Sequence, residues 1–281
     1  MDTDLLKTFL EVYRTRHFGK AADNLYITRS AVSFRLKQLE SLLGVILFDR
    51  ERNNIKPTPA GERMLAHANA VLTALERAKQ DVSLIEQHSV QLSIGMGHNI
   101  WESYLKRAIQ PLYKTEHGLS LRTDVITSAV MAKKMAETTL DIALSFDPFH
   151  IDGIDTITLS QVNLLLVSTQ ANLHISDLAL SHYVKVDWGT AFNITHAQEL
   201  TALPLPVLHT SSAQIAHDFI IQNKGCAFLP EVMVTEDIAC GKLHRVCDVN
   251  EIRRHVYASY ALTSERMNEI EKVIGLLNRI A

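Results

Sequence analysis

Side chains suited to reading DNA bases recur on one face of a helix that the sequence predicts to begin at Arg29. Counted from Ser30, the residues Ser33, Phe34 and Lys37 follow after three, four and seven positions, so all four share one side of that helix. A helix that presents small hydroxyls and a cation early in its length can enter the major groove and reach base edges. The spacing therefore predicts a base-reading surface.

A second group of cations surrounds an Asn-Asn turn. Residues 45–58 are typical of a short apolar strand, a turn at Asn53-Asn54 and a return strand. Cations around such a turn would follow a phosphate backbone, as a wing does. The predicted DNA-contacting residues are Arg29, Ser30, Ser33, Phe34, Lys37, Arg50, Arg52 and Asn53, with Lys56 close to the same turn. The alternative is a small three-helix module that binds protein and keeps its charges solvated.

Catalytic and metal-binding patterns find little support. Gly95-Met96-Gly97 follows a predicted strand, but the third glycine and the later acid of a dinucleotide-binding loop are missing. No P-loop, nucleophile elbow or zinc-ligand spacing occurs, and no two of the thirteen histidines form a metal-binding pair around a carboxylate. We therefore expect no enzyme, no bound metal and no cofactor. Cys240 and Cys247 could form a redox pair, but structural or incidental cysteine is the simpler interpretation, as it is for Cys226.

The charge is unevenly distributed, with a basic N-terminal segment, the head, and an acidic remainder. Residues 1–60 hold ten Lys or Arg and seven Asp or Glu, an excess of +3, whereas the other 221 residues hold 18 and 24, a balance of −6. A solvated surface often produces so small an excess. The chain has 281 residues, enough for about two domains. Its acidic start, few cysteines and lack of a run of about 20 apolar residues predict a reducing, cytoplasmic compartment and no membrane partner.

Three short helices are predicted to position the base-reading face. Thr28 offers a capping oxygen to the third of them, and Gly44 can end it in the left-handed conformation. The residues expected to face inward are Leu5, Leu6, Phe9 and Val12, then Phe18, Ala21, Ala22 and Leu25, then Val32, Leu36, Leu39 and Leu43. Together with the hairpin these helices predict a winged helix-turn-helix domain over residues 1–59.

The stretch from Leu5 to Gly61 resembles the DNA-binding head of LysR-type transcriptional regulators. The residues that carry the resemblance are Phe9, Ala21-Ala22, Leu25, Thr28, Ser30-Ala31-Val32-Ser33, Leu39-Glu40, Leu43-Gly44, Leu47-Phe48, Arg50, Thr58 and Ala60-Gly61. Segments 5–12 and 30–35 are similar to the HdfR branch of that family, which represses a flagellar master operon. The family commonly has Gln where this chain has Arg29, and a polar or basic residue where it has Phe34. These departures predict an operator of its own.

A long helix is predicted after Thr58-Pro59, within a linker over residues 60–89. Its apolar seam alternates in steps of four and three, which is typical of a two-helix coiled coil and predicts self-association. The predicted dimerisation residues are Met64, Ala68, Val71, Leu75, Ala78, Val82 and Ile85. The alternative is an amphipathic helix packed on its own domain. In the family that this chain resembles, the matching helix pairs two subunits, and the resemblance implies a tetramer built from two dimers.

Residues 90–281 alternate predicted strands and helices, which indicates an α/β domain with a largely parallel sheet. By resemblance this region is a two-lobed effector domain similar to periplasmic binding proteins. Its first lobe is expected over about 91–160 plus 264–281, and its second over about 161–263. The alternatives are an enzyme or solute-binding protein with an accessory DNA-binding head, and a repressor whose pocket is vestigial.

Loops after the predicted strands supply the candidate effector site, because ligands of open sheets lie beyond the carboxyl ends of strands. The expected effector-binding residues are Gly97, His98, Asn99, Thr127, Ser128, Thr210 and Ser211, with Phe146 and Trp188 as apolar walls. The expected guest is a small polar or anionic molecule bound between the lobes. Taken singly, Ser and Thr in such loops are usually helix caps and nothing more.

Overall fold

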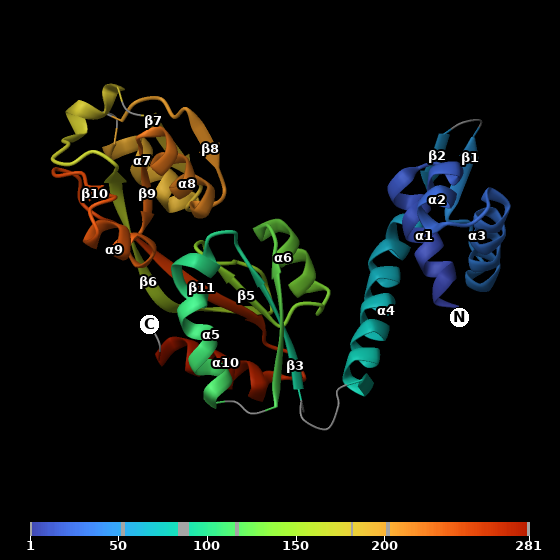
Figure 1. Ribbon diagram of the computed structural model, residues 1–281. Coiled ribbons are helices and arrows are strands. Elements are labelled where there is room, and N and C mark those ends of the chain that lie inside the picture. Colours follow the sequence, from blue (N-terminus) through green and yellow to red (C-terminus); the bar gives the residue numbers. More distant parts are fainter. Residues whose placement is uncertain are drawn as a thin grey trace. The chain divides into compact units, whose positions relative to one another are not determined.

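The computed structural model describes residues 2–51, 54–83, 90–115, 118–180, 182–200 and 203–279. The chain forms two compact units, Met1–Leu84 and Ile85–Ala281 (Figure 1). Among the described residues, no helix is both long and apolar enough to cross a membrane.

The first unit opens with three helices that pack on one another. They are α1 (Thr3–Thr15), α2 (Phe18–Leu25) and α3 (Arg29–Leu43). The Asp2 side chain caps α1 and the Thr28 hydroxyl caps α3 by accepting from the Ala31 N–H, while Gly44 ends α3 in the left-handed conformation. The predicted boundaries of α3 are therefore confirmed. Leu43 is an error of the prediction, because its side chain is exposed and lies outside the buried core of the unit.

A two-stranded hairpin and a long helix complete this unit. β1 (Phe48–Glu51) pairs antiparallel with β2 (Asn54–Pro57), and α4 (Pro59–Ser83) follows. The strand begins later than predicted, since Val45 and Ile46 are exposed and lie outside it. The Thr58 hydroxyl accepts from the Gly61 N–H at 3.1 Å. A Cβ at Gly61 would lie 2.2 Å from the Leu47 carbonyl oxygen, so glycine is required for this close approach.

The second unit is built on one nine-stranded sheet. Its strands are β3 (Val90–Met96), β4 (Leu119–Val125), β5 (Ile142–Ser145), β6 (Ile154–Ser168), β7 (His182–Val186), β8 (Leu208–Thr210), β9 (Gly225–Pro230), β10 (His244–Arg245) and β11 (Ile252–Ala261). The order is β4-β3-β5-β11-β6-β9-β7-β8, with β10 on β6. The strand β3 pairs parallel with β4 and β5, and β7 pairs parallel with β8 and β9. Every strand pair that involves β6 or β11 is antiparallel. The sheet is thus mixed, and less parallel than expected.

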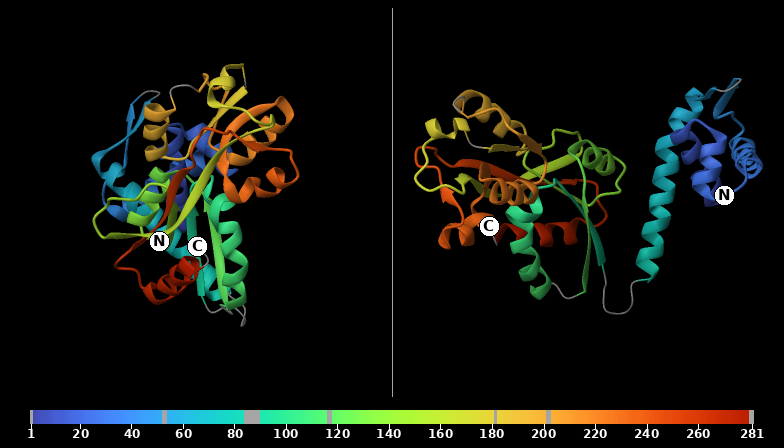
Figure 2. Two further views of the ribbon diagram at one scale, coloured as in Figure 1. Left: turned by 90° about the vertical axis from the view of Figure 1, so that its left-hand side faces the viewer. Right: turned by 45° about the horizontal axis from the view of Figure 1, so that its top comes forward.

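The two long strands β6 and β11 pair side by side in the middle of the sheet and join two lobes (Figures 1 and 2). The first lobe carries β3, β4 and β5, and the second carries β7, β8 and β9. The predicted lobe boundaries require a correction. Residues 257–259 of β11 pair with β5, so they belong to the first lobe, although they fall within the range 161–263. The cause is that a crossing strand has no turn residues at the point where it changes lobes.

Helices cover both lobes around one large apolar core. They are η1 (a π-helical turn, Trp101–Leu105), α5 (Lys106–Thr115), α6 (Ser128–Ala136), η2 (a 3₁₀ helix, Ile175–Leu180), α7 (Thr190–Glu199), α8 (Ala213–Asn223), α9 (Glu231–Ala239) and α10 (Met267–Arg279). Both figures show α5 and α10 adjacent on the first lobe, where the Tyr104 hydroxyl donates to the Leu277 carbonyl at 2.8 Å. The predicted first lobe includes residues 264–281, and α10 lies within that range and packs there.

Candidate nucleic-acid interface and effector pocket

The outer face of α3 presents most of the residues predicted to read bases. Arg29, Ser30 and Lys37 are exposed, Ser33 is half-buried, and Phe34 is 67% exposed. Neither Arg29 nor Lys37 forms an ion pair with any residue that the structure describes. Phe34 does not belong to the described core of this unit, and its exposed ring offers an apolar surface of the kind that contacts a thymine methyl group.

Internal contacts fix α3 from its opposite face. Val32, Leu36 and Leu39 are fully buried. The Arg35 guanidinium pairs with the Asp4 carboxylate on α1 at 2.9 Å, so this cation holds α3 in place. One Glu40 carboxylate oxygen accepts from the N–H groups of Leu47 at 2.9 Å and Phe48 at 3.4 Å, which ties the hairpin to α3. A helix held so firmly can present its outer face in one orientation.

The structure adds one candidate and leaves several predicted residues untested. Tyr26, in the turn between α2 and α3, is 95% exposed, and the sequence analysis missed it because a single aromatic residue in a turn has no periodicity. Arg52 and Asn53 lie outside the described residues, as does the side chain of Arg50. Lys56 on β2 is exposed.

The predicted seam of α4 divides into two parts. Met64 and Ala68 pack against the core of their own unit, and Ala68 is fully buried there. For these two residues the alternative interpretation, packing within the chain, is the correct one. Farther along, Leu75 is half-buried and Ala78 is exposed, while Val71 and Val82 are 44% and 88% exposed. Ile85 lies outside the described residues.

A cavity of about 370 Å³ opens between the lobes at the carboxyl ends of several strands. Seven of the nine predicted effector-binding residues line it, namely Gly97, His98, Asn99, Thr127, Ser128, Phe146 and Ser211. Ile126, Ser145, Asp147, Asp187 and Gly189 complete the lining. The prediction was wrong for Trp188 and Thr210. Trp188 is fully buried and its indole N–H donates to the Phe228 carbonyl at 3.1 Å, and the Thr210 hydroxyl accepts from the Ser212 N–H.

Asn99 joins the two lobes through its side-chain amide. The Nδ2 group donates to the Asp187 carbonyl at 3.0 Å, and the Oδ1 atom accepts from the Ala213 N–H at 2.8 Å. Both partners belong to the second lobe, whereas Asn99 follows β3 in the first. Because both ends of the amide are engaged and the residue is buried, Asn99 positions the lobes as well as lining the cavity.

A partly buried ion pair forms a second side-chain connection between the lobes. The Arg254 guanidinium on β11 donates to the Asp147 carboxylate at 2.7 Å, to the Phe146 carbonyl at 2.7 Å and to the Trp188 carbonyl at 3.0 Å. The Asp147 carboxylate also accepts from the Thr190 N–H at 2.7 Å. Gly189 has φ +87°, and a Cβ there would lie 2.7 Å from that carboxylate. The close approach of the chain to Asp147 therefore requires glycine at this position.

The polar groups left for a guest are few. The Asp147 carboxylate is neutralised by Arg254, whereas the Thr127 side chain makes no capping hydrogen bond at the start of α6. The first turn of α6 therefore keeps N–H donors for an acceptor group. Asp187 and His98 are exposed at the same cavity. The arrangement suits a small polar molecule, with an acceptor at α6 and a donor facing the Asp187 carboxylate.

The three cysteines are free thiols. Cys226 is buried in β9, and burial raises the pKa of its thiol to about 12. Cys240 and Cys247 are exposed. The Cys240 thiol donates to the Asp237 carbonyl at 3.5 Å. Among the described residues, no group of three or more His, Cys, Asp or Glu side chains could hold a metal ion.

Comparison with known proteins matches each part of the chain to a family of described proteins. Residues 3–62 match the family described as "Bacterial regulatory helix-turn-helix protein, lysR family", and residues 86–280 match "LysR substrate binding domain". "HTH-type transcriptional regulator HdfR" from Yersinia enterocolitica is 38% identical over 98% of this chain and 95% of its own length. The protein of the same name from Yersinia pestis (strain Pestoides F) is 37% identical over the same shares of the two chains.

Solved structures support the fold. Full-length CbnR complexed with its target DNA has a TM-score of 0.70 at 16% identity and covers 100% of both chains. Vibrio fischeri DarR in complex with DNA has a TM-score of 0.63 at 20% identity, covering 100% of this chain and 99% of its own. The branch that segments 5–12 and 30–35 indicated agrees with the HdfR relatives. The chain thus belongs to the LysR family and is a DNA-binding transcriptional regulator with an effector-binding domain, not an enzyme.

Proposed function

We propose that this regulator binds its own operator as a dimer and responds to a small polar effector held between the lobes. The observation that carries the proposal is the cavity of about 370 Å³, lined by residues from both lobes at the ends of strands. A guest that contacts both lobes stabilises one arrangement of them over others. In this way effector binding would alter the placement of paired heads on DNA.

Base recognition is assigned to the outer face of α3. Ser33 and Lys37 would contact base edges, Arg29 a guanine or a phosphate, and Phe34 a thymine methyl group. Arg50 and Arg52 would follow the phosphate backbone, as in the sequence-based prediction. This division separates specificity from affinity, because phosphate contacts bind any DNA sequence.

Selection of bound genomic fragments, followed by affinity measurements on the selected operator, tests this assignment. We expect Ser33→Ala and Lys37→Ala to weaken operator binding, since losing a base contact costs about 1–3 kcal/mol. Arg50→Ala should weaken binding to specific and random DNA alike and reduce the dependence on salt. Lys272→Ala, an exposed cation of α10, serves as the control. Equal affinity of the Ser33, Lys37, Arg50 triple variant and the parent would refute the assignment.

The effector is expected to carry an acceptor or anionic group at the start of α6 and a donor toward Asp187. A thermal-shift screen of small metabolites on the full chain tests this pocket. We expect Ser128→Ala to weaken any ligand found about 2- to 10-fold, the range for one hydrogen bond. Ser176→Ala, an exposed serine outside the pocket, is the control. If no compound stabilises the protein and none changes operator binding, the pocket is vestigial.

Self-association is assigned to the outer part of α4. Val71 and Val82 leave apolar surface exposed on a helix of 25 residues, and Ala78 between them allows a close approach of a second helix. Two linked heads combine their affinities on neighbouring half-sites, which explains how a domain with an excess of only +3 can bind specifically. Pairing of two such dimers into a tetramer is the further step that the family resemblance implies.

A further inference from the structure

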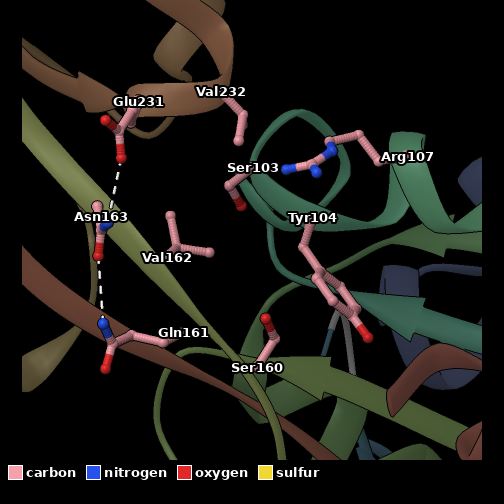
Figure 3. A pocket seen from close by; sticks show the side chains of 9 residues that line it. All are labelled: Ser103, Tyr104, Arg107, Ser160, Gln161, Val162, Asn163, Glu231 and Val232. Atoms are coloured by element: carbon pink, nitrogen blue, oxygen red, sulfur yellow. Dashed lines mark hydrogen bonds between the residues drawn. The ribbon is translucent and has the colours of Figure 1, made fainter. Parts of the chain in front are cut away.

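A second, smaller pocket of about 190 Å³ lies away from the interlobe cavity. Its walls come from η1 and the start of α5 in the first lobe, from the crossing strand β6, and from the start of α9 in the second lobe (Figure 3). It shares no lining residue with the interlobe cavity. At about 30 Å³ per water molecule, its volume corresponds to roughly six waters, the size of a small metabolite.

One wall of this pocket is a hydrogen-bonded chain that ends in a carboxylate. The Gln161 amide donates to the Asn163 carbonyl oxygen at 3.2 Å, and the Asn163 amide donates to the Glu231 carboxylate at 3.1 Å (Figure 3). This chain holds the Glu231 side chain at the pocket with one oxygen, which leaves its second oxygen as an acceptor. The anion is therefore positioned, unlike a freely rotating surface glutamate.

The opposite wall carries a cation. Arg107 is exposed, its guanidinium points toward Ser103, and it forms no ion pair with any residue in the described parts of the chain (Figure 3). Arg107 and Glu231 are thus separated by more than ion-pair distance across one pocket. The Ser103 hydroxyl donates to the Asn99 carbonyl at 2.6 Å, so its oxygen remains an acceptor. Val162 and Val232 supply aliphatic surface between the two charges.

We propose that this pocket binds a small zwitterion of the amino-acid type. The carboxylate of the zwitterion would form a bidentate ion pair with the Arg107 guanidinium, a geometry for which arginine is well suited. Its ammonium group would donate to Glu231, and its carbon chain would lie on the two valines. A molecule with only one of these charges would leave one wall unpaired. Because Arg107 and Glu231 belong to different lobes, the zwitterion would also bridge them.

Isothermal titration of the full-length protein tests the proposal with glycine, β-alanine, 4-aminobutyrate and 5-aminovalerate, which differ in charge separation. Propionate and propylamine are the single-charge comparisons. We expect one member of the series to bind at least tenfold more tightly than either comparison. Arg107→Ala and Glu231→Gln should each weaken that binding at least tenfold, and Arg107→Lys less. The control variants are Lys106→Ala and Glu236→Gln, exposed residues on the same two helices, and they should leave it unchanged.

Three results would overturn the proposal. One is the absence of binding by every zwitterion in the series at 10 mM, well above a typical metabolite affinity. Another is binding that Ser128→Ala removes but Arg107→Ala does not, which would place the ligand in the interlobe cavity. The third is a change of oligomer mass in Arg107→Ala or Glu231→Gln without any effect on ligand binding, which would make this face an interface between copies of the chain.

Discussion

Replacing Arg254 by Met tests whether the hydrogen bonds of its guanidinium hold the two lobes together. The substitution keeps most of the side-chain volume but removes three hydrogen bonds, to two carbonyl oxygens and to the Asp147 carboxylate. The Arg254 side chain is 7% exposed and the Asp147 side chain is 38% exposed, so water can rehydrate the carboxylate more easily than the carbonyls. Each unsatisfied buried carbonyl costs about 1–3 kcal/mol. The two carbonyls together therefore set an expected loss of about 2–6 kcal/mol, because the carboxylate regains water.

Urea unfolding followed by tryptophan fluorescence measures this loss, because both tryptophans, Trp101 and Trp188, belong to the second unit. Thermal unfolding gives a second measure. For a domain of this size a loss of 1 kcal/mol lowers Tm by about 2–4 °C, so the Tm of the variant should be roughly 10 °C lower. Arg253→Met is the matched control. Arg253 neighbours Arg254 on β11, but its side chain is 64% exposed and pairs with Glu251 at the surface, so the control should cost below about 1 kcal/mol. Equal losses of unfolding free energy in the two variants would refute the claim that Arg254 holds the lobes together.

Three further predictions concern the long helix, its first turn and the thiols. Val82→Glu should weaken self-association in sedimentation experiments without unfolding the protein, whereas Ala70→Glu, exposed but off the seam, should not; equal effects would exclude the seam. Gly61→Ala should destabilise the first unit by about 1–3 kcal/mol in thermal unfolding followed by circular dichroism, because its Cβ would meet the Leu47 carbonyl; an unchanged Tm contradicts this. At pH 8 a thiol reagent should modify Cys240 and Cys247 quickly but Cys226 only after denaturation, and three fast thiols would contradict its burial.

The head was predictable because its signals are local. Apolar spacing located α1, α2 and α3, and the caps Thr28 and Gly44 fixed the boundaries of α3. The errors include Leu43, which is exposed, the start of the first hairpin strand, and Met64 and Ala68, which pack on their own unit. The alternation of apolar residues in steps of four and three shows which face of a helix is apolar. It does not show which other part of the protein covers that face. Ala68 therefore matched a coiled coil as well as it matches the core of the head.

The interlobe cavity was located more accurately than its connections. Strand order alone placed seven lining residues, because ligands lie beyond strand ends. Asp147 and Arg254 were missed, since each looks like a surface charge in sequence. A signal for Arg254 was present, however. Arg254, Val256 and Ala258 alternate on one face of β11, and all three are buried. An arginine in the inward register of a strand indicates a buried partner, because a lone buried cation is too costly.

The turn at Asn99–Ser103 gives the two pockets a common element. Asn99 binds the second lobe through its amide, and its carbonyl accepts from the Ser103 hydroxyl, which faces the smaller pocket. The π-helical turn η1 (Trp101–Leu105) overlaps this segment, and such turns often occur at functional sites. A guest that moves the turn must therefore act on the contacts of Asn99 with the second lobe. Thermodynamic linkage then requires the effect to be mutual, so occupancy of either pocket should change affinity at the other.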